Sequence, residues 1–290
     1  MRVLVVGAGL MGAQIGCEYA LGGHAVTALA RNPGTAEERI EAALETVGGL
    51  ELASLEEVAA ARSRIVAAAS PELDGWNLVV ESVPEDAELK ATLLRPVARA
   101  SPGTIIASNT SSLSVSELGR AIGAPERTLG THYWNPPLLM PLVEVVAGAG
   151  TEPTVIERIR AILTHLGKRP VVVGDVPGFV WNRLQMAILR ESVWLAENGI
   201  ASPDTIDEIL SHGLARRWRN VGFFEAIGLG GVDTWQRAAG NLLPELSAVT
   251  ELPDLRRWTK DPAALSDEAT RRDAGLARDL IEERSADERR

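Results

Sequence analysis

Short apolar runs alternate with longer amphipathic stretches over the first part of the chain. The runs have the length of buried strands, and the stretches between them carry apolar residues at helical spacing. This alternation is typical of a parallel sheet joined by crossover helices. The pattern therefore predicts an α/β fold. The predicted strands are RVLVV, HAVTAL, RIVAA, WNLVVESVPE, TIIA, TLGTHYW, LVEVVAG and a closing strand within KRPVVVGD.

The pattern changes after DVPGF, and from Phe179 onward it is helical alone. We therefore predict a Rossmann-like dinucleotide-binding domain at residues 1–175 and an all-helical second domain at residues 176–290. Ser202 and Pro203 have the residue types of an N-cap and a first helical position. The charged tail from about Ser266 predicts a partly ordered helix with a frayed end.

The first helix of the second domain has an apolar face formed by Leu184, Ile188 and Val193. A face of this kind suits a dimer interface as well as a core, and we expect a homodimer through the helical domain.

Composition narrows the class of protein. The chain has 290 residues, of which 46% are hydrophobic and 23% charged, as in ordinary globular proteins. A net charge of -10 argues against nucleic acid or an anionic membrane surface as the main partner. The chain has no apolar window long enough for a membrane span, and its first residues lack a signal-peptide pattern. Cys17 is the only cysteine, which excludes an internal disulfide and suits the reducing cytoplasm.

A glycine-rich turn follows the first strand at once. Gly7, Gly9 and Gly12 have the spacing of the dinucleotide fingerprint, and a helical stretch begins within the turn. The turn also contains Leu10 and Met11, so these five residues are expected to bind a dinucleotide. Its anionic pyrophosphate would be held by the backbone amides of the helix N-terminus.

The end of the second predicted strand indicates which dinucleotide is preferred. An acidic residue is expected there for the adenosine ribose, but the position carries Ala30, followed by Arg31. An arginine at this place accommodates a 2′-phosphate, so we expect NADP in preference to NAD. The alternative is that Arg31 is a solvated loop residue.

Polar side chains gather between residues 108 and 144. Ser111, Ser112, His132, Asn135 and Glu144 are assigned to short turns between apolar segments. An imidazole exchanges protons near neutral pH, and a neighbouring carboxylate would hold its tautomer and stabilise its protonated form. The serine hydroxyls and Asn135 would then bind a substrate oxygen. The alternative is a histidine packed in the core beside aromatic residues.

Glu85 and Lys90 follow the strand WNLVVESVPE. In a parallel sheet they would lie near the carboxyl edge, where ligands bind. An exposed ion pair is the alternative. No metal site is expected, because the single cysteine excludes a cysteine-based zinc site.

Six segments together resemble the L-3-hydroxyacyl-CoA dehydrogenase family, including relatives such as L-gulonate 3-dehydrogenase and L-carnitine dehydrogenase. The resemblance covers roughly residues 1–240. The segments are GAGLMG at 7–12, VVESVPE at 79–85, SNTSSL at 108–113, HYWNPP at 132–137, LVEVV at 142–146 and PGFVWNRL at 177–184.

The resemblance implies catalytic roles for several residues. It makes His132 the general base and Glu144 its partner. It places substrate-oxygen contacts on Ser111 and Asn182, and an active-site or structural role on Asn135. The implied fold is a Rossmann-like domain followed by a helical dimerisation domain.

The resemblance also implies contacts with the cofactor. It places Glu85 and Lys90 on the nicotinamide side. Asn109, in the SNTSSL segment, is expected to bind the cofactor as well.

The chain departs from the family in ways that bear on the substrate. The predicted helical hairpin at residues 34–62 has seven glutamates and no lysine, and they stand against Arg39, Arg62 and the following Arg64. Coenzyme A phosphates would need a basic surface. The family's G-P-F-E segment is GFFE at 222–225, with Phe223 in place of proline. An expected aspartate is Gly228, and a glycine-rich aromatic segment near the C-terminus is missing.

Another segment offers positive charge. Arg216 and Arg217 lie in LARRWRN, where guanidiniums around an indole would bind a substrate carboxylate. A solvated basic loop is the alternative.

We therefore expect an enzyme that interconverts a secondary hydroxyl and a ketone on a small 3-hydroxy acid or acyl derivative, using NADP or NAD. One alternative is a dehydrogenase of coenzyme A or carrier-protein thioesters. Another is a crystallin-like protein that binds the cofactor without turnover.

Overall fold

A computed structural model of the chain describes residues 1–70, 72–259 and 265–287. The chain forms two compact units. The first comprises Met1–Val180 together with Ser266–Arg290, and the second comprises Trp181–Leu265. The α/β class and the helical second part agree with the sequence prediction.

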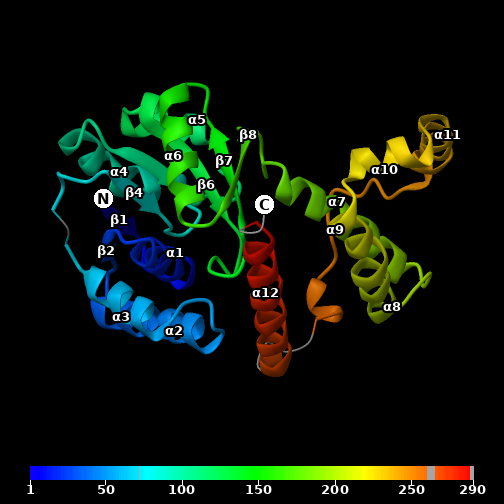
Figure 1. Cartoon of the computed structure of the whole chain (residues 1–290). Coiled ribbons are helices and arrows are strands. Elements are labelled where there is room, and N and C mark those ends of the chain that lie inside the picture. Colours follow the sequence, from blue (N-terminus) through cyan, green and yellow to red (C-terminus); the bar gives the residue numbers. More distant parts are fainter. Residues whose placement is uncertain (71, 260–264, 288–290) are drawn as a thin grey trace. The chain divides into compact units, whose positions relative to one another are not determined.

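The first unit is built on one eight-stranded sheet (Figure 1). Its strand order is β3-β2-β1-β4-β5-β6-β7-β8, and the first six strands in chain order are parallel. Strand β7 is antiparallel to β6, and β8 is parallel to β7. The strands are β1 Arg2–Val6, β2 Ala25–Leu29, β3 Ile65–Ala68, β4 Leu78–Glu81, β5 Ile105–Ser108, β6 Thr128–Tyr133, β7 Leu142–Ala147 and β8 Arg169–Gly174.

Helices cover both faces of this sheet because its central strands are apolar on both sides. On β1, Val3 and Val5 pack into one core cluster, while Leu4 and Val6 pack into the other. Helices α1, α2 and α6 contribute to the first cluster, and α4 and α5 to the second. The helices of the sheet region are α1 Leu10–Leu21, α2 Pro33–Gly49, α3 Leu55–Arg64, α4 Ala87–Ala100, α5 Val115–Ile122 and α6 Pro153–His165.

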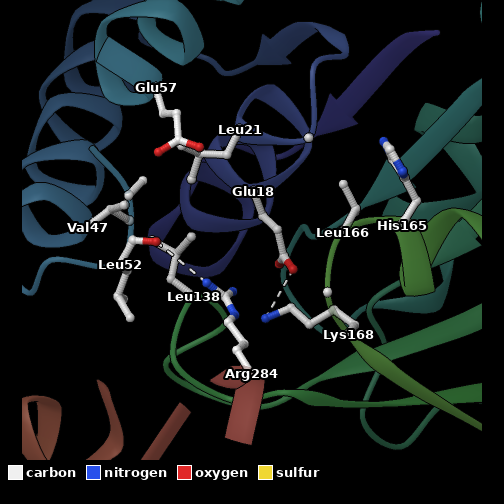
Figure 2. A pocket seen from close by; sticks show the side chains of 13 residues that line it. Glu18, Leu21, Val47, Leu52, Glu57, Leu138, His165, Leu166, Lys168 and Arg284 are labelled. Atoms are coloured by element: carbon white, nitrogen blue, oxygen red, sulfur yellow. Dashed lines mark hydrogen bonds and ion pairs between the residues drawn. The ribbon is translucent and has the colours of Figure 1, made fainter. Parts of the chain in front are cut away.

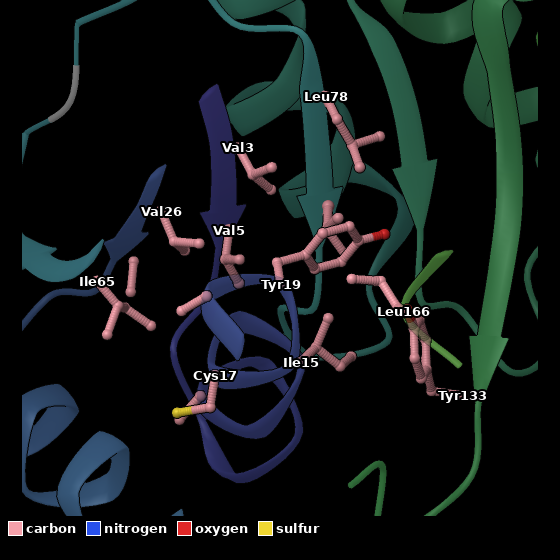
Figure 3. Packing of buried hydrophobic residues seen from close by; sticks show 14 of the residues in the cluster. Val3, Val5, Ile15, Cys17, Tyr19, Val26, Ile65, Leu78, Tyr133 and Leu166 are labelled. Atoms are coloured by element: carbon pink, nitrogen blue, oxygen red, sulfur yellow. The ribbon is translucent and has the colours of Figure 1, made fainter. Parts of the chain in front are cut away.

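The first cluster also holds the single cysteine (Figure 3). Cys17 lies on α1 with no exposed surface, and its thiol lies 3.7 Å from the carbonyl oxygen of Ile40. Burial, followed by the nearby Glu41 carboxylate, raises the pKa of its thiol to about 12. The thiol therefore stays protonated and acts as a small apolar group.

The final helix, α12 (Ser266–Asp287), groups with the first unit. Ala277 and Leu280 are buried, and the Arg284 guanidinium lies 3.5 Å from the carbonyl oxygen of Leu52. The tail is therefore helical, as expected. The tail was expected in the second domain, but it groups with the first unit. The expected frayed end, at residues 288–290, lies outside the described residues.

The second unit is helical. Ser202 caps helix α8 by accepting a hydrogen bond from the Thr205 amide, and Pro203 is the first helical residue, as predicted. Its elements are α7 Trp181–Glu197, α8 Pro203–Glu208, the π-helix Ile209–Ala215, α9 Arg216–Asn220, α10 Phe223–Gly230, α11 Val232–Leu242 and two short 3₁₀ helices, Leu243–Glu245 and Leu255–Arg257. In the part of the chain that the structure describes, no helix is long and apolar enough to cross a membrane.

Candidate functional site

The glycine-rich turn joins β1 to α1. Gly7 has a φ of 99°, and its amide and that of Ala8 both donate to the Leu29 carbonyl at 3.0 Å. A Cβ on Gly12 would lie 2.0 Å from the Gly7 carbonyl oxygen, whereas a Cβ on Gly9 would meet nothing within 4 Å. Gly12 thus permits close helix–turn packing, and the backbone at Gly9 is open to a ligand.

Helix α1 begins directly at this open position. Gly9 is its N-cap, and no side chain among the described residues caps the helix. The first amides of the helix are therefore available to an anion, which the helix dipole favours. Leu10 is 61% exposed and Met11 is partly buried. These features fit the pyrophosphate of a dinucleotide.

At the end of β2, the chain carries Ala30 and the exposed Arg31, and Asn32 caps α2 by accepting from the Thr35 amide. A second arginine reaches this region from α2. The Nη1 atom of Arg39 donates to the Ala8 carbonyl at 3.3 Å. The sequence pattern does not indicate this contact of Arg39, because it depends on how α2 packs against α1.

A buried charge cluster underlies the carboxyl ends of β4 and β5. The Nζ atom of Lys90 lies 2.8 and 2.9 Å from the two carboxylate oxygens of Glu81, and the Ser108 hydroxyl donates to Glu81 at 2.5 Å. The Val83 amide donates to Glu81 at 2.6 Å. Glu81 and Lys90 are 0% and 1% exposed, so the pair lies inside the sheet edge.

Glu85 contacts this cluster through Lys90. Its Oε2 is 3.2 Å from Lys90 Nζ, and its Oε1 accepts from the Thr110 hydroxyl at 2.6 Å and from the amides of Ser111 and Ser112 at 2.8 Å each. Burial raises its pKa, but these hydrogen bonds and Lys90 outweigh burial and lower the pKa to about 2. Glu85 is therefore an ionised carboxylate that fixes the turn after β5.

This geometry excludes an exposed ion pair between Glu85 and Lys90. Lys90 is buried, and its Nζ is occupied by Glu81, Glu85 and the Val83 carbonyl at 3.2 Å. Lys90 thus holds Glu85 at the edge of the sheet, and its expected contact with the cofactor stays a prediction. The pair of Glu85 and Lys90 is not an exposed ion pair, since only the Glu85 side chain, 32% exposed, reaches solvent.

Asn109 links three strands at the same edge. Its amide donates to the Glu81 carbonyl at 2.7 Å, and its side-chain oxygen accepts from the Tyr133 amide at 2.9 Å. The side-chain nitrogen lies 3.3 Å from the Ser82 hydroxyl. Asn109 thus sets the spacing of the strand ends that carry Glu81 and His132.

His132 and Glu144 face each other across β6 and β7. They are register partners in the antiparallel ladder, and His132 Nδ1 lies 2.7 Å from Glu144 Oε2. They are 5% and 2% exposed. The Val180 amide donates to the other Glu144 oxygen at 3.1 Å, and the Phe179 ring packs edge-on against the imidazole at 5.5 Å between centroids.

The expectation that His132 and Glu144 lie on turns was wrong, because both belong to strands. The exposed residues Ser111, Ser112 and Asn135 do lie in turns, as expected. Asn135 precedes a cis peptide bond to Pro136.

A buried lysine, Lys168, donates hydrogen bonds to the loop between β6 and β7. Lys168 Nζ donates to the carbonyls of Pro137 at 2.7 Å and Met140 at 2.9 Å. It also forms an ion pair with Glu18 Oε1 at 3.0 Å, and both residues are 6% exposed. This buried pair was not anticipated, since Glu18 and Lys168 are far apart in sequence.

A cavity of about 280 Å³ lies beside this pair (Figure 2). Glu18, Lys168 and Arg284 line it together with apolar side chains such as Leu138 and Leu166. It includes none of the residues that the sequence analysis assigned to a cofactor or substrate.

Asn182, Arg216 and Arg217 belong to the second unit. Asn182 lies in the first turn of α7, and the two arginines are exposed at the start of α9. Their expected substrate contacts therefore stay predictions.

Comparison with known proteins agrees with this geometry. Residues 2–176 match the model of the 3-hydroxyacyl-CoA dehydrogenase, NAD binding domain, and residues 178–260 match the C-terminal domain of the same family. The chain belongs to the 3-hydroxyacyl-CoA dehydrogenase family. The glycine-rich turn and the edge at Glu85 are thus parts of this family's NAD binding domain.

Relatives in this family differ in their named substrates. An L-carnitine dehydrogenase of Oceanobacillus iheyensis is 32% identical, over 93% of this chain and 87% of its own length. A probable 3-hydroxybutyryl-CoA dehydrogenase of Bacillus subtilis is 31% identical, over 79% of this chain and 81% of its own. The crystal structure of an NAD+-dependent 5-formyl-3-hydroxy-2-methylpyridine 4-carboxylic acid 5-dehydrogenase superposes with a TM-score of 0.85 and 29% identity, covering 97% of this chain and 98% of that one.

Proposed function

We propose that this chain is a dehydrogenase that interconverts a secondary hydroxyl and a ketone on a small 3-hydroxy acid, with His132 as general acid and base. The observation that supports this most strongly is the buried pair of His132 and Glu144 beside the Phe179 ring. Among the described residues, no hydrogen bond involves the Nε2 atom of His132, so this nitrogen is available for a substrate proton.

The pair supports proton transfer in both directions. During oxidation, His132 Nε2 accepts the hydroxyl proton, and Glu144 stabilises the imidazolium through Nδ1. The Val180 amide donates to the second oxygen of Glu144 and so helps to fix the orientation of the carboxylate. During reduction, the same nitrogen returns the proton. Ser111, Asn135 and Asn182 are the proposed contacts for substrate oxygens.

The cofactor would be held by the turn from Gly7 to Gly12 and by the first amides of α1. A bound nicotinamide dinucleotide accepts or donates the hydride. Glu85 and Asn109 would shape the nicotinamide side, because Glu85 fixes the turn at Ser111 and Ser112 while Asn109 ties the ends of β4 and β6 together.

Within the NAD binding domain, we propose a preference for NADP over NAD. The support is local. Ala30 stands where a carboxylate would pair with ribose hydroxyls, and Arg31 is exposed beside it. A charge-assisted contact of this kind gives roughly a 10- to 100-fold preference.

We propose a small free acid, and not a coenzyme A thioester, as the substrate. The hairpin of α2 and α3 has no lysine, and Arg62 is already paired with Glu37 and Glu41. Arg216 and Arg217, exposed on α9, are the proposed partners for the substrate carboxylate. The relatives named for carnitine and for a pyridine carboxylic acid are compatible with this class.

We further infer a homodimer that forms through the helical unit, where many apolar side chains are exposed. A cytoplasmic location is inferred from the single, buried cysteine, which suits a reducing compartment.

The test is the oxidation of matched 3-hydroxy acids and their coenzyme A thioesters with either cofactor, followed by nicotinamide absorbance. We expect higher efficiency on free acids and with NADP. His132→Ala should lower kcat by about 100-fold or more while the dinucleotide still binds. His24→Ala, on the α1–β2 turn, is the matched control and should leave kcat nearly unchanged. Unchanged turnover in His132→Ala would remove the histidine from the mechanism, and better kinetics on thioesters would reverse the substrate assignment.

A further inference from the structure

Two arginines, Arg31 and Arg39, lie near the end of β2. Arg31 follows the strand, and Arg39 is on the second turn of α2. Among the described residues, neither forms an ion pair, and the hydrogen bond from Arg39 to the Ala8 carbonyl at 3.3 Å is the single bond of that guanidinium. An arginine has five N–H donors, so Arg39 retains most of its capacity for a ligand.

The contact with Ala8 places the Arg39 guanidinium at a defined point of the fold. Ala8 lies between the first two glycines of the turn, and the amides of Gly7 and Ala8 both donate to the Leu29 carbonyl at 3.0 Å. The guanidinium therefore lies where the glycine-rich turn meets the carboxyl end of β2. This is the place where dinucleotide-binding folds hold the adenosine ribose.

The surrounding carboxylates do not neutralise Arg39. Glu37 and Glu41, on the same helix, both pair with Arg62 from α3, at 2.8 Å for Glu37. The Glu37 carboxylate also accepts from the Ala67 amide at 3.0 Å. Arg39 is thus a positive group on a hairpin of net negative charge, and its guanidinium contacts the dinucleotide turn.

We propose that Arg39 binds the 2′-phosphate of NADP together with Arg31. This inference rests on the proposed NADP preference and adds a residue that the end of β2 alone does not indicate. The hydrogen bond to Ala8 orients the guanidinium, and its remaining donors suit the oxygens of a phosphate monoester. Arg31, next to the strand end, supplies the second charge.

The experiment is a calorimetric titration with adenosine 2′,5′-bisphosphate and adenosine 5′-monophosphate, which differ by the 2′-phosphate alone. The proteins are the full chain, Arg39→Ala, Arg39→Lys and the control Arg64→Ala. Arg64 makes an equivalent contact, from Nη1 to the Ala20 carbonyl at 3.4 Å, at the other end of α1. Arg39→Ala should weaken binding of the bisphosphate by roughly 10-fold or more and of the monophosphate less than about twofold.

Arg39→Lys should recover part of the lost bisphosphate affinity, since it restores the charge without the planar donors. Arg64→Ala should change neither affinity. A wild type that binds both nucleotides equally would overturn the NADP preference itself. If the wild type favours the bisphosphate and Arg39→Ala keeps that ratio, the preference stands and the role of Arg39 is overturned. An equal loss for both ligands also overturns it, because the effect is then not on the 2′-phosphate.

Discussion

The two units bury their apolar side chains to different degrees. In the first unit, strands and helices enclose residues such as Val5, Leu44 and Ile106 at 0–2% exposure. In the second, the buried apolar residues among those described are Val193 and Ile206, while Phe224 is 87% exposed. A large exposed apolar surface on a folded unit usually marks a site where another protein surface binds.

The two units also differ in the side chains that they offer for function. The first unit pairs several of its buried charged groups, such as Glu81 with Lys90 and Glu18 with Lys168, and these pairs lie beside loops of the site. The second unit offers exposed apolar helices, which are what the proposed dimer would bury.

The first prediction concerns the buried pair below the β6–β7 loop. Lys168→Met should lower the free energy of unfolding by about 3 to 5 kcal/mol, because it leaves the Glu18 carboxylate buried without its cation and removes two loop contacts. Burial raises the pKa of Glu18, and Lys168 opposes that rise. Urea denaturation measures the loss.

Arg160→Met is the control, since Arg160 forms an exposed pair with Glu157 at 2.9 Å and should change stability by less than about 0.5 kcal/mol. Equal small losses in both variants would show that the buried pair does not hold the loop.

The second prediction compares the same substitution in the two units. Leu44→Ala, at 2% exposure on α2, should cost about 3 kcal/mol, because it opens a cavity in the core of the first unit. Leu243→Ala, at 65% exposure in the second unit, should cost less than about 0.5 kcal/mol at protein concentrations below self-association. Thermal unfolding under one buffer measures both. Similar losses of stability in the two variants would mean that the second unit is more tightly packed than the exposed fractions of its side chains indicate.

The third prediction concerns the ionised carboxylate at the sheet edge. The pKa of Glu85 is lowered from 4.5 to about 2, so its ionised form stabilises the fold above about pH 4.5, and this contribution is lost as pH falls toward 2. Glu85→Gln should therefore lower the free energy of unfolding at pH 7 by about 1 to 2 kcal/mol, after allowance for its partial exposure. The difference in the free energy of unfolding between wild type and Glu85→Gln should become smaller as the pH falls from 4.5 to 3.

Glu88→Gln, on the exposed side of α4, is the control and should leave the pH dependence nearly as in wild type. A gap between wild type and Glu85→Gln that stays constant from pH 7 to 3 would contradict the role of Glu85.

The fourth prediction tests the exposed face of the helical unit. Phe224→Ser should change the free energy of unfolding of dilute protein by less than about 0.5 kcal/mol, yet weaken self-association measured by sedimentation. Leu55→Ser is the control, because Leu55 is 83% exposed on α3 of the first unit and should leave self-association unchanged. If Phe224→Ser self-associates like the wild type, the dimer does not use this face.

Much of the fold was accessible from local sequence. Backbone sterics alone explain the glycines of the turn at Gly7, Gly9 and Gly12. The Ser202 cap depends on a contact three residues away. The strands were found because each is a short apolar run bounded by turn residues. These features are local, so a sequence pattern is enough to predict them.

The charged contacts of the site were decided by tertiary structure. His132 and Glu144 meet because the antiparallel register of β6 and β7 pairs them, and a shift of one residue would turn one side chain to the other face. Lys90 is buried because α4 packs over the end of β4. Arg39 reaches Ala8 because α2 packs against α1. Residue types and their spacing do not contain these distances, since each depends on where separate elements lie once the core has formed.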